Sequence, residues 1–359
     1  MGWVPLACRQ CSARATGDMP VAPVSLNRGL AKQKTHLESH PMPQTLQEYA
    51  DWLDNRNLIW PKLTAPVQPK ATPSLKPLRG IRAVTWSLYG TLLRIADGQL
   101  LYHHPQQFRM QVALEKTIEE FNMWHSMSRK PGAPWEYMLT QYTGVLEKQQ
   151  MRGTKRKGDF PEMDSSEIWR TLIARLVKNE FSWDESMYGD LDGLSLKVAY
   201  FFHTRLQAVE VAEHAVGALN AVDLANIAQA LLADAQPFSL VQMLRAFGQV
   251  GTLPPSTLFG ADVMTLSFRL GVRKPSKSLY LYALKQFQQQ GISPPEVLHV
   301  GNRLCGDLAE AKRQGMKTAL YAGDADSVQA SKDDMKNPET RPDRLMTDLN
   351  QIGQILGIA

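Results

Sequence analysis

Three short polar stretches of the sequence have the residue types of an anion-handling site. The first, SLYGT, begins at Ser87 directly after the apolar run 81–86. The second, GVRKP, contains Lys274, and the third, GNRLCGD, ends at Asp307. A hydroxyl, a lysine and a carboxylate that lie close together can hold an oxyanion or exchange a proton. Whether they meet depends on the elements that carry them.

The apolar runs before these stretches are typical of buried strands. Strands alternating with helices predict βαβ units on a parallel sheet, with helices on both faces. We expect strands at 81–86, 228–232, 263–267, 296–300, 318–321 and 344–347. The carboxyl ends of parallel strands meet at one edge of a sheet. The residues predicted to converge there are Ser87, Ala233, Lys274, Asn302 and Asp307.

Between the first and second strands the pattern becomes helical. Apolar residues at helical spacing predict four helices between about 105 and 208, the first burying Phe108 and Ile118. The predicted fold is therefore a Rossmann-like, doubly wound α/β core formed by 81–96 and 215–359, interrupted by a helical insertion at 97–214.

The segment before the core has a different character. Residues 1–41 lack apolar periodicity and are predicted to be a disordered basic leader, and Met42 is an alternative start. Residues 42–80 are predicted to form a short helix that begins with the capping box Thr45–Glu48, followed by a proline-rich arm that lies on the body. Residues 1–80 hold 10 basic and 5 acidic residues, which leaves 30 of each in the remainder. The net charge of +5 is therefore no sign that the core binds nucleic acid.

Composition excludes several other classes of protein. The chain is 43% hydrophobic and 21% charged, as in globular proteins, and no apolar stretch is long enough to cross a membrane. Its three cysteines do not indicate a disulfide framework, which fits a cytoplasmic location. Cys8 and Cys11 form a C-x-x-C, either a zinc or redox pair or an adventitious pair in the leader.

Four segments together resemble the motifs of the haloacid dehalogenase-like (HAD) superfamily of hydrolases. WSLYGTLL is similar to the first motif, LLADAQ stands in the place of the second, GVRKPS resembles the third and HVGNRLCGD the fourth. The resemblance spans about 81–359 and implies a HAD-like core whose helical insertion is the family's cap.

The resemblance also implies roles for single positions. The family has a nucleophilic aspartate where this chain has Ser87, an acid/base aspartate where it has Tyr89, and a hydroxyl where it has Ala233. A carboxylate that binds Mg²⁺ is replaced by Asn302. Lys274 and Asp307 match the family.

These departures predict that the family's aspartate mechanism does not operate. We expect no resident metal, and we expect no base beside Ser87, because His299 lies inside a strand and points into the core or against a helix. Lys274 and Asp307 are expected either to pair structurally or to bind a phosphate or another anion.

The predicted function is a catalytically impaired binding or interaction module for a small anionic ligand or a protein. The alternative is an active, phosphatase-like hydrolase with an unusual nucleophile or a site completed by a partner, which would restore a need for Mg²⁺.

Overall fold

One parallel sheet organises the core. The computed structural model describes residues 43–127, 132–260 and 264–358. In these residues, six strands form a parallel sheet in the order β10-β9-β8-β1-β5-β6. Their bounds are β1 Ala83–Trp86, β5 Ala228–Ala233, β6 Thr265–Leu266, β8 Val297–Gly301, β9 Lys317–Tyr321 and β10 Arg344–Met346.

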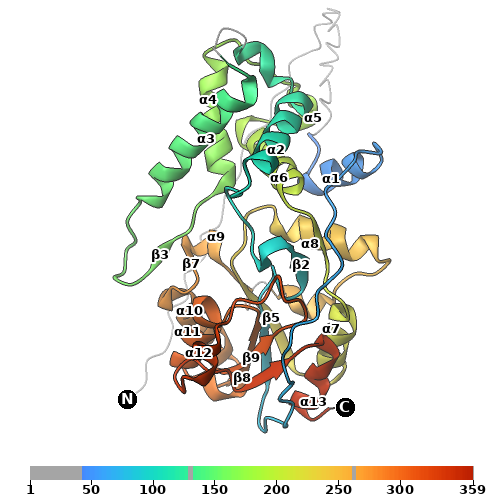
Figure 1. Ribbon diagram of the computed structural model, residues 1–359, viewed down its shortest axis with the longest axis vertical. Helices are drawn as coiled ribbons and strands as arrows, with labels where there is room; N and C mark the ends of the chain where they lie inside the picture. Colours follow the sequence, from blue (N-terminus) through green and yellow to red (C-terminus); the bar gives the residue numbers. More distant parts are fainter. Residues whose placement is uncertain (1–42, 128–131, 261–263, 359) are drawn as a thin grey trace, which may run out of the picture. The chain divides into compact units, whose positions relative to one another are not determined.

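Helices pack on both faces of this sheet, as right-handed crossovers between parallel strands require (Figure 1). Side chains alternate along β1, so that Val84 and Trp86 join one apolar cluster and Ala83 joins the other. The first cluster includes α7 Ala215–Leu224, α8 Ser239–Gln249 and α13 Ile352–Leu356, and the second includes α10 Lys277–Gln289 and α11 Ala309–Arg313. The predicted Rossmann-like α/β class is confirmed.

The order of the strands determines where a site can form. β1 lies between β8 and β5, with Trp86 opposite Val300 on one side and Leu231 on the other. The chain fills one side of β1 first and then crosses to the other side, so β1 is the point at which the strand order reverses. Ligand sites in such sheets lie beyond the carboxyl ends of the strands at this point. Here those ends are followed by Ser87, Asp234 and Asn302.

A helical cap is inserted between two short antiparallel strands, β2 Leu93–Ile95 and β4 Val209–Val211. Its helices share an apolar cluster of their own, which includes Tyr142, Trp169 and Phe202. The cap helices are α2 Gln107–Glu120, α3 Pro134–Gln150, α4 Ser165–Val177, α5 Glu185–Tyr188 and α6 Leu191–Leu206. The inserted cap is confirmed as part of the fold class, while the boundaries at 97 and 214 stay a prediction.

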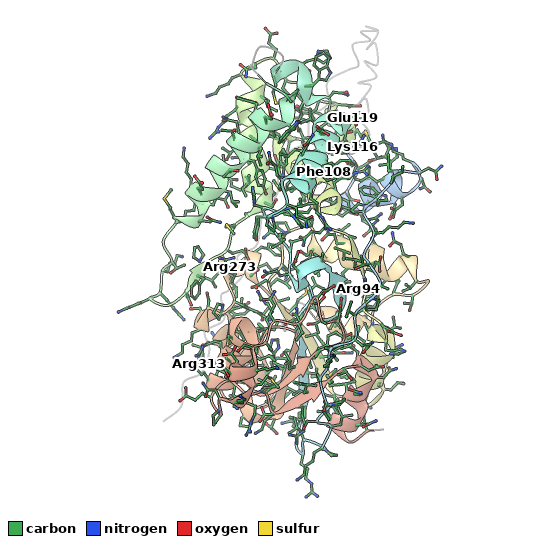
Figure 2. All side chains as sticks on the ribbon, viewed as in Figure 1. Arg94, Phe108, Lys116, Glu119, Arg273 and Arg313 are labelled. Carbon is green, nitrogen blue, oxygen red and sulfur yellow. The ribbon has the colours of Figure 1, made fainter. Side chains whose placement is uncertain are left out.

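The buried face of α2 differs from the predicted one. Phe108 lies in the first turn and is 72% exposed, whereas Met110, Ala113 and Leu114 are buried (Figure 2). The prediction is therefore wrong for Phe108, because the apolar stripe of α2 starts two residues later, whereas Ile118 is buried as predicted.

The segment before β1 contacts both cap and core. Helix α1, Leu46–Asp54, begins with the predicted capping box between Thr45 and Glu48 and buries Tyr49 in the apolar cluster of the cap. The extended chain that follows hydrogen-bonds to the core, for example from Leu78 N to Ile355 O at 2.8 Å.

The predictions for the leader 1–41, including Cys8 and Cys11, concern residues outside the described ranges. Within the described ranges, none of the helices has the length and apolarity needed to cross a membrane.

Candidate functional site

Three of the predicted site residues meet beyond the end of β1. The Lys274 Nζ lies 2.7 Å from the Ser87 Oγ and 2.8 Å from the Asp307 Oδ2. The Ser87 Oγ in turn donates to the same Asp307 oxygen at 2.6 Å. All three side chains are buried. The expected convergence of these three residues is therefore confirmed.

The Asp307 carboxylate is satisfied on both oxygens. Its Oδ2 accepts from Ser87 and Lys274, and its Oδ1 lies 2.8 Å from both the Tyr280 hydroxyl and the His299 Nε2. Burial opposes ionisation, but interactions with His299 and Lys274 hold the pKa of Asp307 well below its ordinary value. Burial also lowers the pKa of Lys274, and Asp307 opposes that change. The result is a closed ion pair surrounded by hydrogen bonds.

His299 lies inside β8 and packs against Tyr280 of α10, as expected, but its ring also reaches Ser87, which was not expected. Its Nε2 lies 3.5 Å from the Ser87 Oγ and its Nδ1 lies 2.8 Å from the Thr85 Oγ1. Burial lowers the pKa of His299, which favours the neutral ring at neutral pH. In the neutral form, Nε2–H donates to Asp307 and Nδ1 accepts from Thr85. A polar residue in the apolar run VLHVG, paired with Thr85 across the sheet, was the signal in the sequence.

Tyr89 and Ala233 are not part of the cluster. The Tyr89 hydroxyl donates to the Gln242 Oε1 at 2.6 Å, and burial raises its pKa far above neutrality. This phenol therefore holds the first-motif loop against α8 and is a poor proton donor. Ala233 ends β5 and packs in the apolar cluster of the core.

Asn302 joins three loops. Its Nδ2 donates to Gly98 O at 2.9 Å and to Ser327 O at 2.8 Å. Gly90 lies against the same amide, since a Cβ on Gly90 would stand 2.1 Å from the Asn302 Nδ2, and its φ of +78° also favours glycine. The Asn302 side chain thus links the carboxyl end of β8 to the loops at Gly90, Gly98 and Ser327.

These donors do not fit Mg²⁺, which needs hard oxygen ligands in octahedral order. Asp307 already accepts four hydrogen bonds, and Asn302 directs its NH₂ group to two carbonyls. The Asn302 Oδ1 is buried and has no partner in the described ranges, but it offers one neutral oxygen. No group of three or more His, Cys, Asp or Glu side chains suited to a metal occurs among the described residues.

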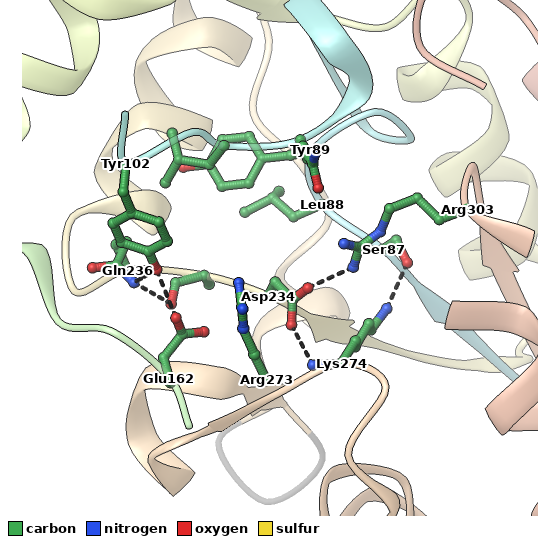
Figure 3. A pocket seen from close by; sticks show the side chains of 13 residues that line it. Ser87, Leu88, Tyr89, Tyr102, Glu162, Asp234, Gln236, Arg273, Lys274 and Arg303 are labelled. Carbon is green, nitrogen blue, oxygen red and sulfur yellow. Dashed lines mark hydrogen bonds and ion pairs between the residues drawn. The ribbon is translucent and has the colours of Figure 1, made fainter. Parts of the chain in front are cut away.

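A small cavity of about 60 Å³ separates the cluster from the cap (Figure 3). Asp234 forms part of its wall, where it accepts from the Lys274 backbone N–H at 2.8 Å and pairs with Arg303 at 2.5 Å. Glu162 and Arg273 also line it. Sequence reasoning missed Glu162, Arg273 and Arg303 as site residues. Glu162 reaches the cavity from the cap, whereas Arg273 and Arg303 stand in the stretches GVRKP and GNRLCGD beside residues that were singled out.

The fold and the cluster define a class: a capped, doubly wound α/β protein with a buried lysine–aspartate pair at the carboxyl ends of its strands. Residues 271–352 match the family model described as HAD-hydrolase-like. This part of the chain is therefore similar to the HAD-like hydrolases, which confirms the resemblance stated from the motifs.

Solved structures of similar fold cover most of the chain at low identity. A 2-haloacid dehalogenase from Pseudomonas syringae is 18% identical, with a TM-score of 0.49, over 77% of this chain and 98% of that one. A HAD phosphatase from Thermococcus onnurineus is 15% identical, with a TM-score of 0.42, over 77% of this chain and 98% of that one. No curated protein matches the chain.

Proposed function

We propose that this chain is a catalytically impaired HAD-like protein that acts as a binding or interaction module. One observation carries the proposal: the Ser87 hydroxyl stands after β1 and donates to Asp307 at 2.6 Å, with Lys274 bonded to both. A serine whose proton is directed to a carboxylate with a lowered pKa is a weak nucleophile. Asn302 supports the same proposal. Its neutral amide is hydrogen-bonded to two loops at the position where the family has a carboxylate that binds the metal.

The module would bind a small anionic ligand or a protein in the cytoplasm. The basic groups on the cavity wall support the anionic ligand. The small number of cysteines supports the location. A partner nucleic acid is not proposed, because the excess of positive charge falls in residues 1–80.

The proposal predicts no Mg²⁺-dependent hydrolysis. The full chain would be assayed with an aryl phosphate and a short 2-chloro acid, with and without Mg²⁺, beside Lys274→Ala as the background. The expected rate equals that background, because no acyl-phosphate or ester intermediate can form on Ser87 by the aspartate route. Turnover well above Lys274→Ala would contradict the proposal.

A restoration series adds a positive test. Ser87→Asp, then with Tyr89→Asp, then with Asn302→Asp, would be assayed in the same way after circular dichroism shows that each variant is folded. Activity that appears only in the triple variant supports the loss of a former mechanism. Wild-type activity well above the Lys274→Ala background and equal to that of the triple variant would argue against it.

A second candidate, an active serine hydrolase, is favoured by a different observation. The Lys274 Nζ lies 2.7 Å from the Ser87 Oγ, and burial lowers the pKa of this lysine. A neutral lysine at that distance can take the proton of a serine nucleophile. Hydrolysis of an aryl ester that resists EDTA and is lost in Ser87→Ala would establish this candidate and overturn the first.

A further inference from the structure

The cavity between core and cap contains a cation that forms no ion pair with another described residue. Lys274 and Arg303 are paired with Asp307 and Asp234 respectively. Arg273, the last residue of β7 Val272–Arg273, is half-buried and lines the same cavity. Within residues 43–127, 132–260 and 264–358, its side chain has neither a hydrogen bond nor an ion pair. Its guanidinium keeps its bidentate donors for a ligand.

The backbone fixes Arg273 at the junction of core and cap. β7 pairs antiparallel with β3 Phe160–Pro161, so that Phe160 stands opposite Arg273, and Glu162 N donates to Gly271 O at 3.0 Å. This pairing holds Glu162 and Arg273 on the same cavity wall, and Figure 3 shows Arg273 between Glu162 and Asp234. The backbone of Arg273 is therefore held in place by the pairing of β7 with β3.

Hydrogen bonds hold the Glu162 side chain on the wall of the cavity. The Tyr102 hydroxyl donates to its Oε1 at 2.6 Å, and the Gln236 Nε2 donates to Tyr102 at 2.6 Å. Burial, and then the nearby charge of Asp234, raise the pKa of Glu162 to about 7, although bonds from Ser267 and Tyr102 oppose the change. This carboxyl therefore takes up a proton more readily than an exposed glutamate.

We propose that this cavity binds a short-chain carboxylate, held by Arg273 and by the carboxyl group of Glu162. The proposal deepens the binding role proposed above and rests on it. One unpaired cation matches one negative charge, which favours a carboxylate over the more highly charged phosphate. The planar guanidinium fork matches a carboxylate in two hydrogen bonds. A volume of about 60 Å³ is far below the roughly 300–1,000 Å³ of sites for larger ligands, so the chain of the acid must be short.

Binding should weaken as the pH rises through the range in which Glu162 ionises. Protonated Glu162 donates to the ligand, whereas ionised Glu162 repels it. The other charged and titratable groups that line this cavity are Asp234, Arg303, Arg273, Lys274 and Tyr102. Asp234 is paired with Arg303. Burial raises the pKa of Tyr102 well above its ordinary value, so Tyr102 does not replace Glu162 as the titrating group between pH 6 and 8.

The test uses acetate as the probe and the full chain as the protein. Acetate binding would be followed by ligand-observed NMR at pH 6 and pH 8, against chloride at the same ionic strength, with inorganic phosphate as a second arm. Arg273→Gln should weaken acetate binding by about tenfold or more, and Arg273→Lys should lose less. Arg313→Gln is the matched control, because Arg313 lies on α11 with its side chain 59% exposed (Figure 2). Glu162→Gln should bind at both pH values without the loss at pH 8.

Three outcomes would overturn the proposal. The first is equal acetate binding by wild type and Arg273→Gln, with both shown to be folded by circular dichroism. The second is no acetate binding at pH 6. The third is stronger binding of phosphate, abolished by Lys274→Met, which would move the ligand to the lysine. Because hydrolysis is measured separately, a chain that neither hydrolyses nor binds acetate refutes only this proposal, whereas turnover refutes the proposed function.

Discussion

Lys274 and Asp307 form an ion pair that is costly to break on one side only. Both side chains are almost completely buried and lie 2.8 Å apart. Removing one partner leaves an uncompensated buried charge, so Asp307→Asn should lower the free energy of unfolding by about 3–5 kcal/mol. Lys274→Met with Asp307→Asn should lose less than the sum of the two single changes. Urea unfolding of the single and double variants measures this.

The surface pair of Lys336 and Asp333 is the matched control, because it lies 3.9 Å apart and is exposed. Asp333→Asn should change the free energy of unfolding by no more than about 0.5 kcal/mol. The pKa of Asp307 is lower in the folded chain than the roughly 3.9 expected when unfolded, so its stabilisation is present above that pH and is lost as the pH falls through the folded value. Additive losses in the double variant would show that the two charges are not coupled.

At the scale of elements, Asn302 links β8 to the loops that contain Gly98 and Ser327. Asn302→Asp replaces two donors by acceptors that face buried carbonyl oxygens. The expected loss is about 2–4 kcal/mol of unfolding free energy, since buried groups lose their hydrogen bonds and a charge is added. Thermal and urea unfolding measure it, with the exposed Asn179→Asp as the control. An Asn302→Asp variant as stable as the wild type would mean that this link contributes little.

The sequence predicted those strands and helices that have a clear local signal. β1, β5, β8 and β9 follow from apolar runs, and the capping box at Thr45 marks the start of α1. The pair β2–β4 was not predicted, because three-residue strands 116 positions apart in the sequence have no local signal of pairing. The small Ala-rich helix α7 was also not assigned, since it lacks a clear polar face.

The site was predictable only where a residue follows a strand. Ser87, Lys274 and Asp307 were placed together by strand ends. His299 was misjudged, because a single sequence does not show which side of β8 faces α10 and the loop of Asp307. Arg273 and Glu162 were missed because a cap strand, β3, brings them to one cavity.

At the scale of the whole molecule, the segment around Trp60 joins core and cap. Its ring lies 5.8 Å from the ring of Phe201 in α6 and 4.1 Å from the guanidinium carbon of Arg205. Arg245 of the core helix α8 lies 5.0 Å from the same ring and donates to Asp54 of α1 at 2.9 Å. One half-buried aromatic residue therefore contacts groups of both parts.

Trp60→Ala should lower the free energy of unfolding by about 2 kcal/mol, roughly half the cost for a fully buried tryptophan. Its neighbour provides the control, because Ile59 is 90% exposed and Ile59→Ala should change little. Urea unfolding would be followed by far-ultraviolet circular dichroism, which reports on cap and core together. If the segment couples the two parts, the Trp60→Ala transition should also broaden, because cap and core then unfold less cooperatively. Equal midpoints and slopes for Trp60→Ala and Ile59→Ala would show that this segment lies on the surface without holding cap and core together.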